Sequence, residues 1–303
     1  MVVASIFVQI PSYHDYEIGR TIRDAIKKSS GNNTINLGLH VSYYKNNDLD
    51  IPVLDNVKVK ISEAPDNLGQ GTSRYIANEF YNGEDYYLQI DSHTRFEKNW
   101  DESLIEDYNF YKGLGLKPAI SCYPGSYEYG ENGLNILNQN GDVSYTDFVE
   151  ELSFQDNSHI PHQRAVPNLS NNIFTRSVSG GSIFSDGSIA SIKPNKYMYF
   201  WGEEILTAVR LYTHGYDLLL PKKQNLYHLY YDKSRGEKNL RRQVGEDFPD
   251  LIKQIDDKSK YELGRILDNK IIGPDALGSV RTLEEYQVFA GINFIDKKIV
   301  PVL

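Results

Sequence analysis

Short apolar segments alternate with amphipathic helical segments over the first third of the chain, and this order restricts the fold more than any other feature. Residues 2–10 are nearly all apolar and largely β-branched, as expected for a strand covered on both faces. Asp15 then fits a helix N-cap, and apolar residues recur at helical spacing until Gly31. Further strands are predicted at 35–41, 57–61 and 86–90, with a helix at 71–80. Repeated β-α-β order predicts an α/β fold with a largely parallel central sheet flanked by helices.

Fewer helices and strands are predicted in the rest of the chain. Helices are expected at 100–111 and 204–213 and strands at 119–123 and 224–231, and residues 250–269 are expected to be mostly helical. The stretch 124–167 is rich in Gly, Asn, Asp and Ser, which is typical of loops and short strands that carry a variable binding surface. Because there is no internal repeat and no linker, we expect a single domain over residues 1–303.

Charge, cysteine content and apolar run length exclude several classes of protein. The chain has 32 Lys and Arg against 41 Asp and Glu, a net charge of −9, which argues against a general nucleic-acid binder. Cys122 is the one cysteine, so no internal disulfide can form, and this favours a reducing compartment. No stretch has the roughly 18 apolar residues that a membrane span needs, and the amino terminus lacks the pattern of a signal peptide. These features predict a cytoplasmic protein without a membrane span.

The most informative segment is LQIDSHTRF, residues 88–96, in which polar residues follow an apolar strand directly. If the extended geometry continues for two residues, Asp91 and His93 point the same way and Ser92 points the other way. A carboxylate beside an imidazole suits a divalent metal, Mn²⁺ or Mg²⁺, with the imidazole favouring Mn²⁺. The alternative is an aspartate that caps a turn beside a solvated histidine, and a short motif does not exclude it.

Two other motifs carry polar residues at the edges of apolar elements. In FWGEE, residues 200–204, Glu203 and Glu204 open the clearest helix, where acidic side chains also simply offset the helix macrodipole. In LYHLYY, residues 226–231, His228 lies on an apolar strand, where it is either a core histidine or a metal ligand.

In this order, the motifs resemble a known family, the cytoplasmic metal-dependent N-acetylglucosaminyltransferases that modify hydroxyproline in proteins. The resemblance is carried by IFVQIPSYHDYE (6–17), GEDYYLQIDSHTRFEKNWDESLI (83–105), YFWGEEILTAVRLYTHGYDLLLP (199–221) and LGSVRTLEEYQVFAGINF (277–294). A weaker resemblance links the chain to polypeptide N-acetylgalactosaminyltransferases, which also have a D-S-H motif. Both families imply a GT-A fold, a UDP-sugar donor and retention of the anomeric configuration.

The resemblance also implies roles for particular residues. Asp91, His93 and His228 would bind the metal, and Glu203 and Glu204 would be the catalytic acidic pair facing the donor sugar. The residues implied to bind the nucleotide-sugar are Ser12, Tyr13, Arg74, Asp91, Ser92, Trp201, Lys233 and Arg235. Residues 1–95 would form a nucleotide-binding half, 96–240 an acceptor and donor-sugar half, and 241–303 a helical C-terminal extension.

The sequence departs from the family in two places. Asn67-Leu68-Gly69-Gln70 replaces an A-R-G-P-like element before Arg74, which puts the details of nucleotide contact in question. Residues 124–167 match little, and this is where an acceptor would be selected. Protein hydroxyproline, Ser or Thr, or a glycan would all serve as the acceptor.

Other functions remain compatible with parts of the pattern. Two histidines and a carboxylate are also the facial triad of a non-haem Fe(II) oxygenase, although such enzymes usually have the order H-x-D…H in a β-barrel-like fold. A non-catalytic nucleotide-sugar-binding module and a nucleotidyltransferase would share the parallel sheet. The expected function is a retaining, metal-dependent transfer of N-acetylglucosamine from a UDP-sugar to a hydroxyl group. Asp91, His93 and His228, called the trio below, are connected to this reaction by the metal, which would neutralise the charge of the leaving diphosphate.

Overall fold

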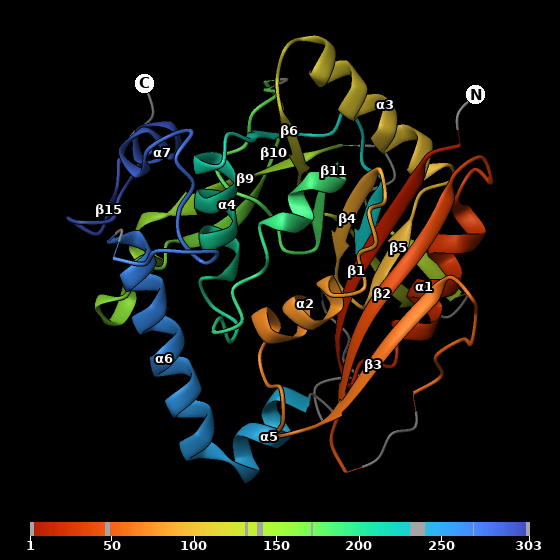
Figure 1. The fold of residues 1–303 in the computed structure, drawn as a ribbon, viewed down its shortest axis with the longest axis horizontal. Coiled ribbons are helices and arrows are strands. Elements are labelled where there is room, and N and C mark those ends of the chain that lie inside the picture. The colour runs from red at the N-terminus through yellow and green to blue at the C-terminus, as the bar shows by residue number, and fades with distance from the viewer. Residues whose placement is uncertain are drawn as a thin grey trace.

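The structure, a computed structural model, confirms the α/β class (Figure 1). It describes residues 3–45, 49–130, 133–137, 142–170, 172–230, 240–268 and 270–300. Its centre is a seven-stranded sheet with the order β12-β6-β11-β4-β1-β2-β3.

Four of the predicted strands form the parallel part of this sheet: β1 (Ser5–Tyr13), β2 (Thr34–Tyr43), β3 (Val57–Glu63) and β4 (Tyr86–Ile90). Beyond β4 lies β11 (Ser182–Asp186), which is antiparallel to both β4 and β6 (Pro118–Ser121), and β12 (Asp217–Leu219) pairs parallel with β6. The sequence analysis did not predict β11 or β12. The strand expected at 2–10 is shifted, since it continues to Tyr13.

Helices cover both faces of the sheet, and the alternation of β1 separates the two cores. Ile6, Val8 and Ile10 face the helices α1 (Ile18–Lys28) and α3 (Trp100–Gly113), where they pack with Ile22 and Trp100. On the opposite face lie α2 (Gln70–Asn78), α4 (Glu203–Thr213) and α7 (Leu283–Ala290). This alternation is what a strand buried on both faces requires.

A smaller four-stranded sheet, ordered β5-β13-β7-β8, lies beside the central one. Its strands are β5 (Thr94–Phe96), β13 (Leu226–His228), β7 (Gly125–Gly130) and β8 (Gly133–Ile136). The strand predicted at 224–231 is thus shorter than expected. Next to it, β9 (Ser144–Val149) and β10 (His162–Pro167) form a hairpin within the stretch that was predicted to hold loops and short strands.

The C-terminal part is mainly helical, with α5 (Leu240–Asp247), α6 (Pro249–Leu267) and α7, followed by the short pair β14 (Ile292–Asn293) and β15 (Lys298–Ile299). In Figure 1, α5 and α6 extend along one side of the molecule, away from α1 and α3. Among the described residues, no helix is both long enough and apolar enough to traverse a bilayer.

The strand order creates a crevice at one end of the sheet. From β1 the chain proceeds to β2 and β3 on one side, whereas β4 lies on the other side of β1, so the order reverses between β1 and β4. Ligands of open α/β sheets bind at such a switch point, beyond the carboxyl ends of the strands. The residues that follow β1 and β4, among them Asp15 and Asp91, therefore meet at this crevice.

Candidate functional site

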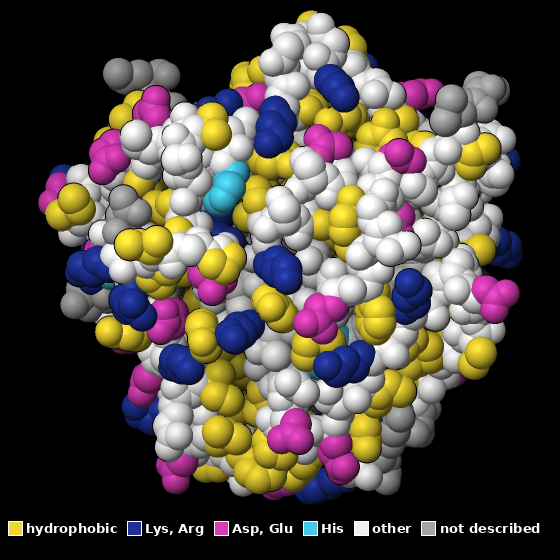
Figure 2. Space-filling model, in the orientation of Figure 1, with side chains coloured by type: hydrophobic (Ala, Val, Ile, Leu, Met, Phe, Trp, Pro, Cys, Tyr) yellow, Lys and Arg dark blue, Asp and Glu magenta, His cyan; other side chains and the backbone are white. Residues whose placement is uncertain are grey.

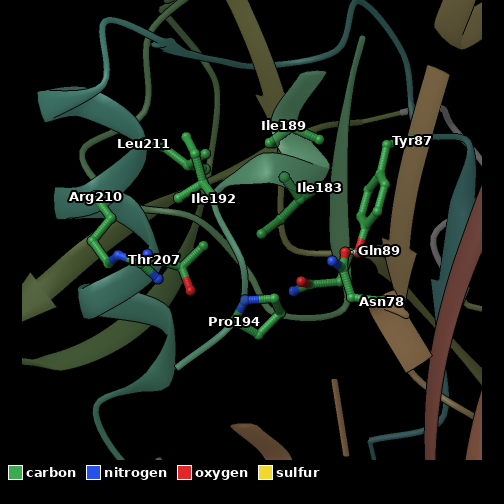
Figure 3. Close-up of a pocket in the computed structure, with 10 residues that line it drawn as sticks. All are labelled: Asn78, Tyr87, Gln89, Ile183, Ile189, Ile192, Pro194, Thr207, Arg210 and Leu211. Atoms are coloured by element: carbon green, nitrogen blue, oxygen red, sulfur yellow. Dashed lines mark hydrogen bonds between the residues drawn. The ribbon is translucent and has the colours of Figure 1, made fainter. Parts of the chain in front are cut away.

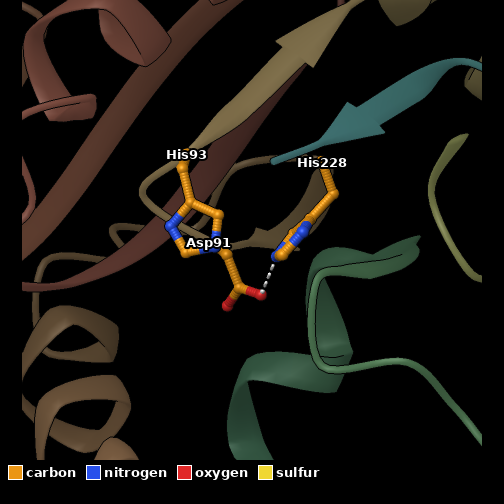
Figure 4. A group of neighbouring side chains, drawn as sticks. All are labelled: Asp91, His93 and His228. Carbon is orange, nitrogen blue, oxygen red and sulfur yellow. Dashed lines mark hydrogen bonds and ion pairs between the residues drawn. The ribbon is translucent and has the colours of Figure 1, made fainter. Parts of the chain in front are cut away.

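The structure brings Asp91, His93 and His228 together at the carboxyl end of β4. One ligand atom from each residue lies within 4.8 Å of the other two. Nε2 of His228 is 3.2 Å from Oδ2 of Asp91, and the two imidazole rings meet edge to face at 4.3 Å (Figure 4). The convergence of these three side chains is the arrangement that the sequence predicted.

The local geometry differs from the extended strand that was expected. β4 ends at Ile90, residues 92 and 93 form a turn, and the hydroxyl of Thr94 donates a hydrogen bond to the carbonyl of Asp91 (2.8 Å). β5 begins at Thr94 and pairs antiparallel with β13, in which His228 lies opposite Thr94. The turn and this pairing, rather than strand alternation, place the two histidines side by side.

Electrostatics favour the protonation states that a metal needs. Burial opposes ionisation of Asp91, but the hydrogen bond from His228 and the charge of Arg74 outweigh it and hold the pKa of that carboxyl below its ordinary value. Burial, and next the neighbouring His93, lower the pKa of His228. An ionised carboxylate and a neutral imidazole are both metal ligands.

Arg74, from α2, is completely buried behind the trio. Nη2 donates to Oδ1 of Asp91 (2.9 Å) and to the carbonyl of Gly180 (2.8 Å), and Nε lies 3.4 Å from Oε1 of Glu203. The guanidinium of Arg74 therefore connects Asp91, in the trio, to Glu203 at the start of α4. The predicted contact of Arg74 with a nucleotide stays a prediction.

Glu203 and Glu204 open α4 beside the trio. Burial raises the pKa of Glu203, and burial together with Glu203 raises the pKa of Glu204 to about 7. The backbone N–H of Gly180 donates to Oε1 of Glu204 at 2.6 Å, which opposes that rise. Both carboxyl groups therefore contact other groups of the site, Arg74 and the Gly180 N–H, and their predicted catalytic role stays a prediction.

Two consecutive glycines make the close approach possible. A Cβ on Gly180 would lie 3.1 Å from Oε2 of Glu203, and a Cβ on Gly181 would lie 3.0 Å from Oδ2 of Asp91. Neither distance is comfortable for a side chain, so this Gly-Gly step lets β11 begin against the acidic groups. The sequence analysis missed both glycines; their signal was a Gly-Gly pair directly before an apolar segment.

The other predicted site residues have varied surroundings. The Ser12 hydroxyl at the end of β1 is buried without a hydrogen-bond partner among the described residues, and Tyr13 packs against the cluster around Leu68 and Tyr199. Trp201 is half exposed and contacts Phe200 edge to face. The Ser92 hydroxyl donates to Oδ2 of Asp15 at 2.7 Å. Lys233 and Arg235 lie outside the described residues.

Asp15 is a further residue of the site that the sequence analysis missed. It was predicted as the N-cap of α1, but the helix begins at Ile18, and Asp15 accepts a hydrogen bond from the Glu17 N–H two residues on. Its other oxygen lies 2.6 Å from Nδ1 of His93. A capping signal and a contact with a distant histidine are indistinguishable in the sequence.

A pocket of about 280 Å³ opens next to the trio. It lies between the start of β7 and the hairpin β9–β10, within the stretch predicted to select an acceptor. Its lining includes Tyr123, Ser126, Gln163, Ala165 and Tyr230. The ring of Tyr230 is 4.4 Å from that of His228, and Nε2 of Gln163 donates to Glu204 at 3.4 Å, so two residues of the lining contact the site.

A second cavity, of about 30 Å³, lies between α4 and the sheet (Figure 3). It has room for a water molecule but not for a substrate. Arg210, which points into this region, donates to the carbonyls of Lys193 and Pro274, each at 2.6 Å. This cavity therefore belongs to the packing of α4.

Comparisons with known proteins identify the family. The model of the family "Glycosyltransferase (GlcNAc)" matches residues 44–243. The chain belongs to this glycosyltransferase family. A search of curated protein sequences found no match. The non-haem oxygenase alternative is thus wrong, because the same three ligand types occur here on a glycosyltransferase fold.

Two solved structures are similar to this chain to different degrees. The structure titled "Crystal structure of GalNAc-T7 with UDP, GalNAc and Mn2+" is similar with a TM-score of 0.56 and 15% identity, covering 94% of this chain and 54% of that one. TarS of S. aureus matches with a TM-score of 0.47 and 10% identity, covering 97% of this chain and 43% of that one. The family and the first of these similarities confirm the GT-A-type fold. The chain spans about half the length of these neighbours.

Proposed function

We propose that this glycosyltransferase moves an N-acetylhexosamine, with N-acetylglucosamine preferred, from a UDP-sugar to a hydroxyl acceptor, with a divalent metal bound and with retention of configuration. The observation that carries the proposal is the meeting of Asp91, His93 and His228 within 4.8 Å, next to Glu203 and Glu204. The family description names GlcNAc, and the GalNAc-T7 neighbour was solved with UDP, GalNAc and Mn²⁺. Both support a UDP-N-acetylhexosamine donor, and the second supports the metal.

The residues present fit a metal such as Mn²⁺ or Mg²⁺. A carboxylate suits both ions, and two imidazoles, which are softer ligands, suit Mn²⁺ better than Mg²⁺. Nδ1 of His228 is buried and has no hydrogen-bond partner among the described residues, so no second hydrogen bond holds this ring. When bound, the metal supplies Lewis-acid stabilisation of the departing diphosphate.

The chain's own residues then have separable roles. Arg74 keeps Asp91 ionised and holds it in place through the 2.9 Å contact. Glu203 and Glu204 face the position of the sugar, where carboxyl groups orient hydroxyls and stabilise positive charge at the anomeric carbon. Retention by two displacements would require one of them as the nucleophile, whereas same-face attack would not. Both routes place these two side chains beside the donor sugar.

Turnover of UDP-N-acetylglucosamine with Mn²⁺ tests the proposal. We expect UDP release that is abolished by EDTA and reduced at least about a hundredfold in Asp91→Asn and His228→Ala, since one electrostatic contact in a site is worth roughly that much. His214→Ala is the matched control, because His214 is a half-buried histidine at the end of α4 that bonds the Arg210 carbonyl instead. UDP-N-acetylgalactosamine, tested in parallel, decides the donor.

Binding of the UDP-sugar without turnover would instead indicate the non-catalytic module. If His228→Ala turned over the UDP-sugar at the parent rate without metal, the trio would not be needed for the reaction. Each result is distinct, because binding is measured by calorimetry and turnover by UDP release.

We also propose that the 280 Å³ pocket receives the acceptor. Its aromatic walls, Tyr123 and Tyr230, and its amide and hydroxyl groups suit a hydroxylated molecule. Arg164 also lies in the lining, and the carboxyl of Glu204 accepts a hydrogen bond from the lining residue Gln163. Protein hydroxyproline, Ser or Thr, and a glycan remain the acceptor classes. A UDP-sugar panel with mass-spectrometric detection of products identifies the acceptor.

A bulky side chain then tests the pocket. Ala165→Trp places a large side chain in the pocket. We expect transfer of the sugar to the acceptor to fall at least about tenfold relative to hydrolysis of the UDP-sugar, because hydrolysis needs the donor site alone. Leu169→Trp, at a position that is 91% exposed and outside the pocket, is the control. Equal loss of both reactions in Ala165→Trp would assign the pocket to the donor sugar.

A further inference from the structure

Asp15, which follows β1, contacts His93 of the trio. Oδ2 of Asp15 lies 2.6 Å from Nδ1 of His93 and accepts the Ser92 hydroxyl at 2.7 Å. Oδ1 accepts the backbone N–H of Glu17 at 2.9 Å. The carboxylate is nearly buried, with a side-chain exposure of 10%. Both of its oxygens are thus engaged, and the group has a fixed orientation.

An ionised carboxylate only accepts hydrogen bonds. The short contact therefore requires that the proton of the His93 ring sits on Nδ1, which leaves the lone pair of Nε2 free for another partner. The tautomer of a histidine is set in this way by the hydrogen bond of its other nitrogen. Such a partner also makes the ligating nitrogen more basic.

We infer that Asp15 is a positioning residue that holds His93 in the Nδ1–H tautomer and in the orientation in which its Nε2 meets the metal. The inference rests on the metal role of the trio in the proposed function. The strand order explains why Asp15 lies next to His93: β1 and β4 are parallel neighbours, and the segments after them meet at the crevice. Asp15 follows β1 by two residues and His93 follows β4 by three.

The variant Asp15→Asn separates this positioning role from a purely structural one. If Asp15 only supports the local fold, the variant should leave the His93 tautomer unchanged. Asparagine keeps an oxygen that can accept the hydrogen bond from the Glu17 N–H, so the turn before α1 is retained. Its amide group in the other position donates a hydrogen bond, which favours the Nε2–H tautomer of His93. That tautomer carries a proton where the metal would bind.

The first measurement is a titration with Mn²⁺ alone, followed by the electron paramagnetic resonance signal of free Mn²⁺. We expect Asp15→Asn to raise the dissociation constant by about 10- to 100-fold, the usual effect of removing an outer partner of a ligating histidine. Asp24→Asn is the matched control: Asp24 lies on α1 and accepts the backbone N–H of Phe96 at 2.7 Å, away from the trio. We expect its affinity to equal that of the parent.

The second measurement is the tautomer of His93 in the metal-free protein, read from long-range ¹H–¹⁵N correlations of the imidazole rings. We expect Nδ1–H in the parent and in Asp24→Asn, and a shift to Nε2–H in Asp15→Asn, with unchanged urea midpoints showing that all three are folded. An Nε2–H tautomer in the parent, or an unchanged tautomer in Asp15→Asn, overturns the inference. Because this readout needs no metal, failure of the parent to bind Mn²⁺ would count against the proposed function alone.

Discussion

Gly181 is the residue whose smallest change most directly tests the trio. A Cβ there would lie 3.0 Å from Oδ2 of Asp91, which is too close, and 3.5 Å from Cδ2 of His228, which is an ordinary contact, so Gly181→Ala shifts the Asp91 carboxylate without removing it. We expect the Mn²⁺ dissociation constant to rise about tenfold, because ligand placement depends on the surrounding groups. Calorimetric titration measures it.

Gly113→Ala is the control for this substitution. Nothing lies within 4 Å of the added Cβ at that helical position, and alanine is the better helix former by about 0.5–1 kcal/mol. We expect it to raise the free energy of unfolding slightly and to leave Mn²⁺ affinity unchanged. Equal Mn²⁺ affinity in Gly181→Ala and the parent would show that the glycine is not needed for metal binding.

Arg74 is predicted to be the residue on which the stability of the site depends most. Its side chain is fully buried between Asp91 and Glu203, so Arg74→Met leaves buried carboxylates without a counter-charge. We expect the free energy of unfolding to fall by about 3–5 kcal/mol in metal-free protein, as measured by urea titration. Arg164→Met, which removes an ion pair to Asp147 from a side chain that is 57% exposed, is expected to cost less than about 1 kcal/mol. A similar small loss for both would contradict the buried network.

Among the elements, β2 carries a buried histidine that links it to its neighbours. His40 contacts the Ser73 hydroxyl of α2 (2.8 Å) and the Ser62 hydroxyl of β3 (2.9 Å). Burial, and next the charge of Lys60, lower the pKa of His40 from 6.5 to about 4. Between these values the unfolded chain binds a proton that the folded protein does not.

The contribution of His40 to the free energy of unfolding should therefore be fully present above pH 6.5 and be lost as the pH decreases toward 4, a loss of at most about 3 kcal/mol. In His40→Gln we expect this part of the pH dependence to disappear, whatever the variant's stability at neutral pH. Urea unfolding at several pH values from 4 to 8 measures both slopes. The same slope in parent and variant would show that His40 titrates normally in the fold.

At the scale of the whole molecule, metal binding should appear as stability. A ligand that binds only the folded state adds about 2.7 kcal/mol at a hundredfold excess over its dissociation constant. We expect Mn²⁺ to raise the melting temperature of the parent and not that of Asp91→Asn, with EDTA reversing the shift. A rise of equal size in both proteins would indicate binding elsewhere, for instance at surface acids of this chain of net charge −9.

On the face of the molecule that Figure 2 shows, Lys and Arg side chains are interspersed with acidic and apolar ones. A nucleic-acid binder concentrates positive charge on one face instead. That the protein has no nucleic-acid partner stays a prediction from the sequence.

How much the sequence could predict depended on the range of the interactions involved. Apolar periodicity is local, so β1, β2, β4, α1, α3 and α4 were predicted close to their observed positions. β11 was missed because Ser182–Asp186 is short and takes its place through pairing with β4 and β6, which lie far from it in the chain. The predicted division of residues 1–95, 96–240 and 241–303 stays a prediction.

Local patterns were enough to predict the β-α-β framework, the Asp91-x-His93 motif after a buried strand and the acidic start of α4, because each depends on neighbours in the chain. Three contacts could be seen only in the folded chain: His228 reaches that motif through β5–β13 pairing, Arg74 is buried between carboxylates, and Asp15 contacts His93. These contacts join segments 17 to 137 residues apart. No local pattern encodes which distant side chains the sheet order brings to the same crevice.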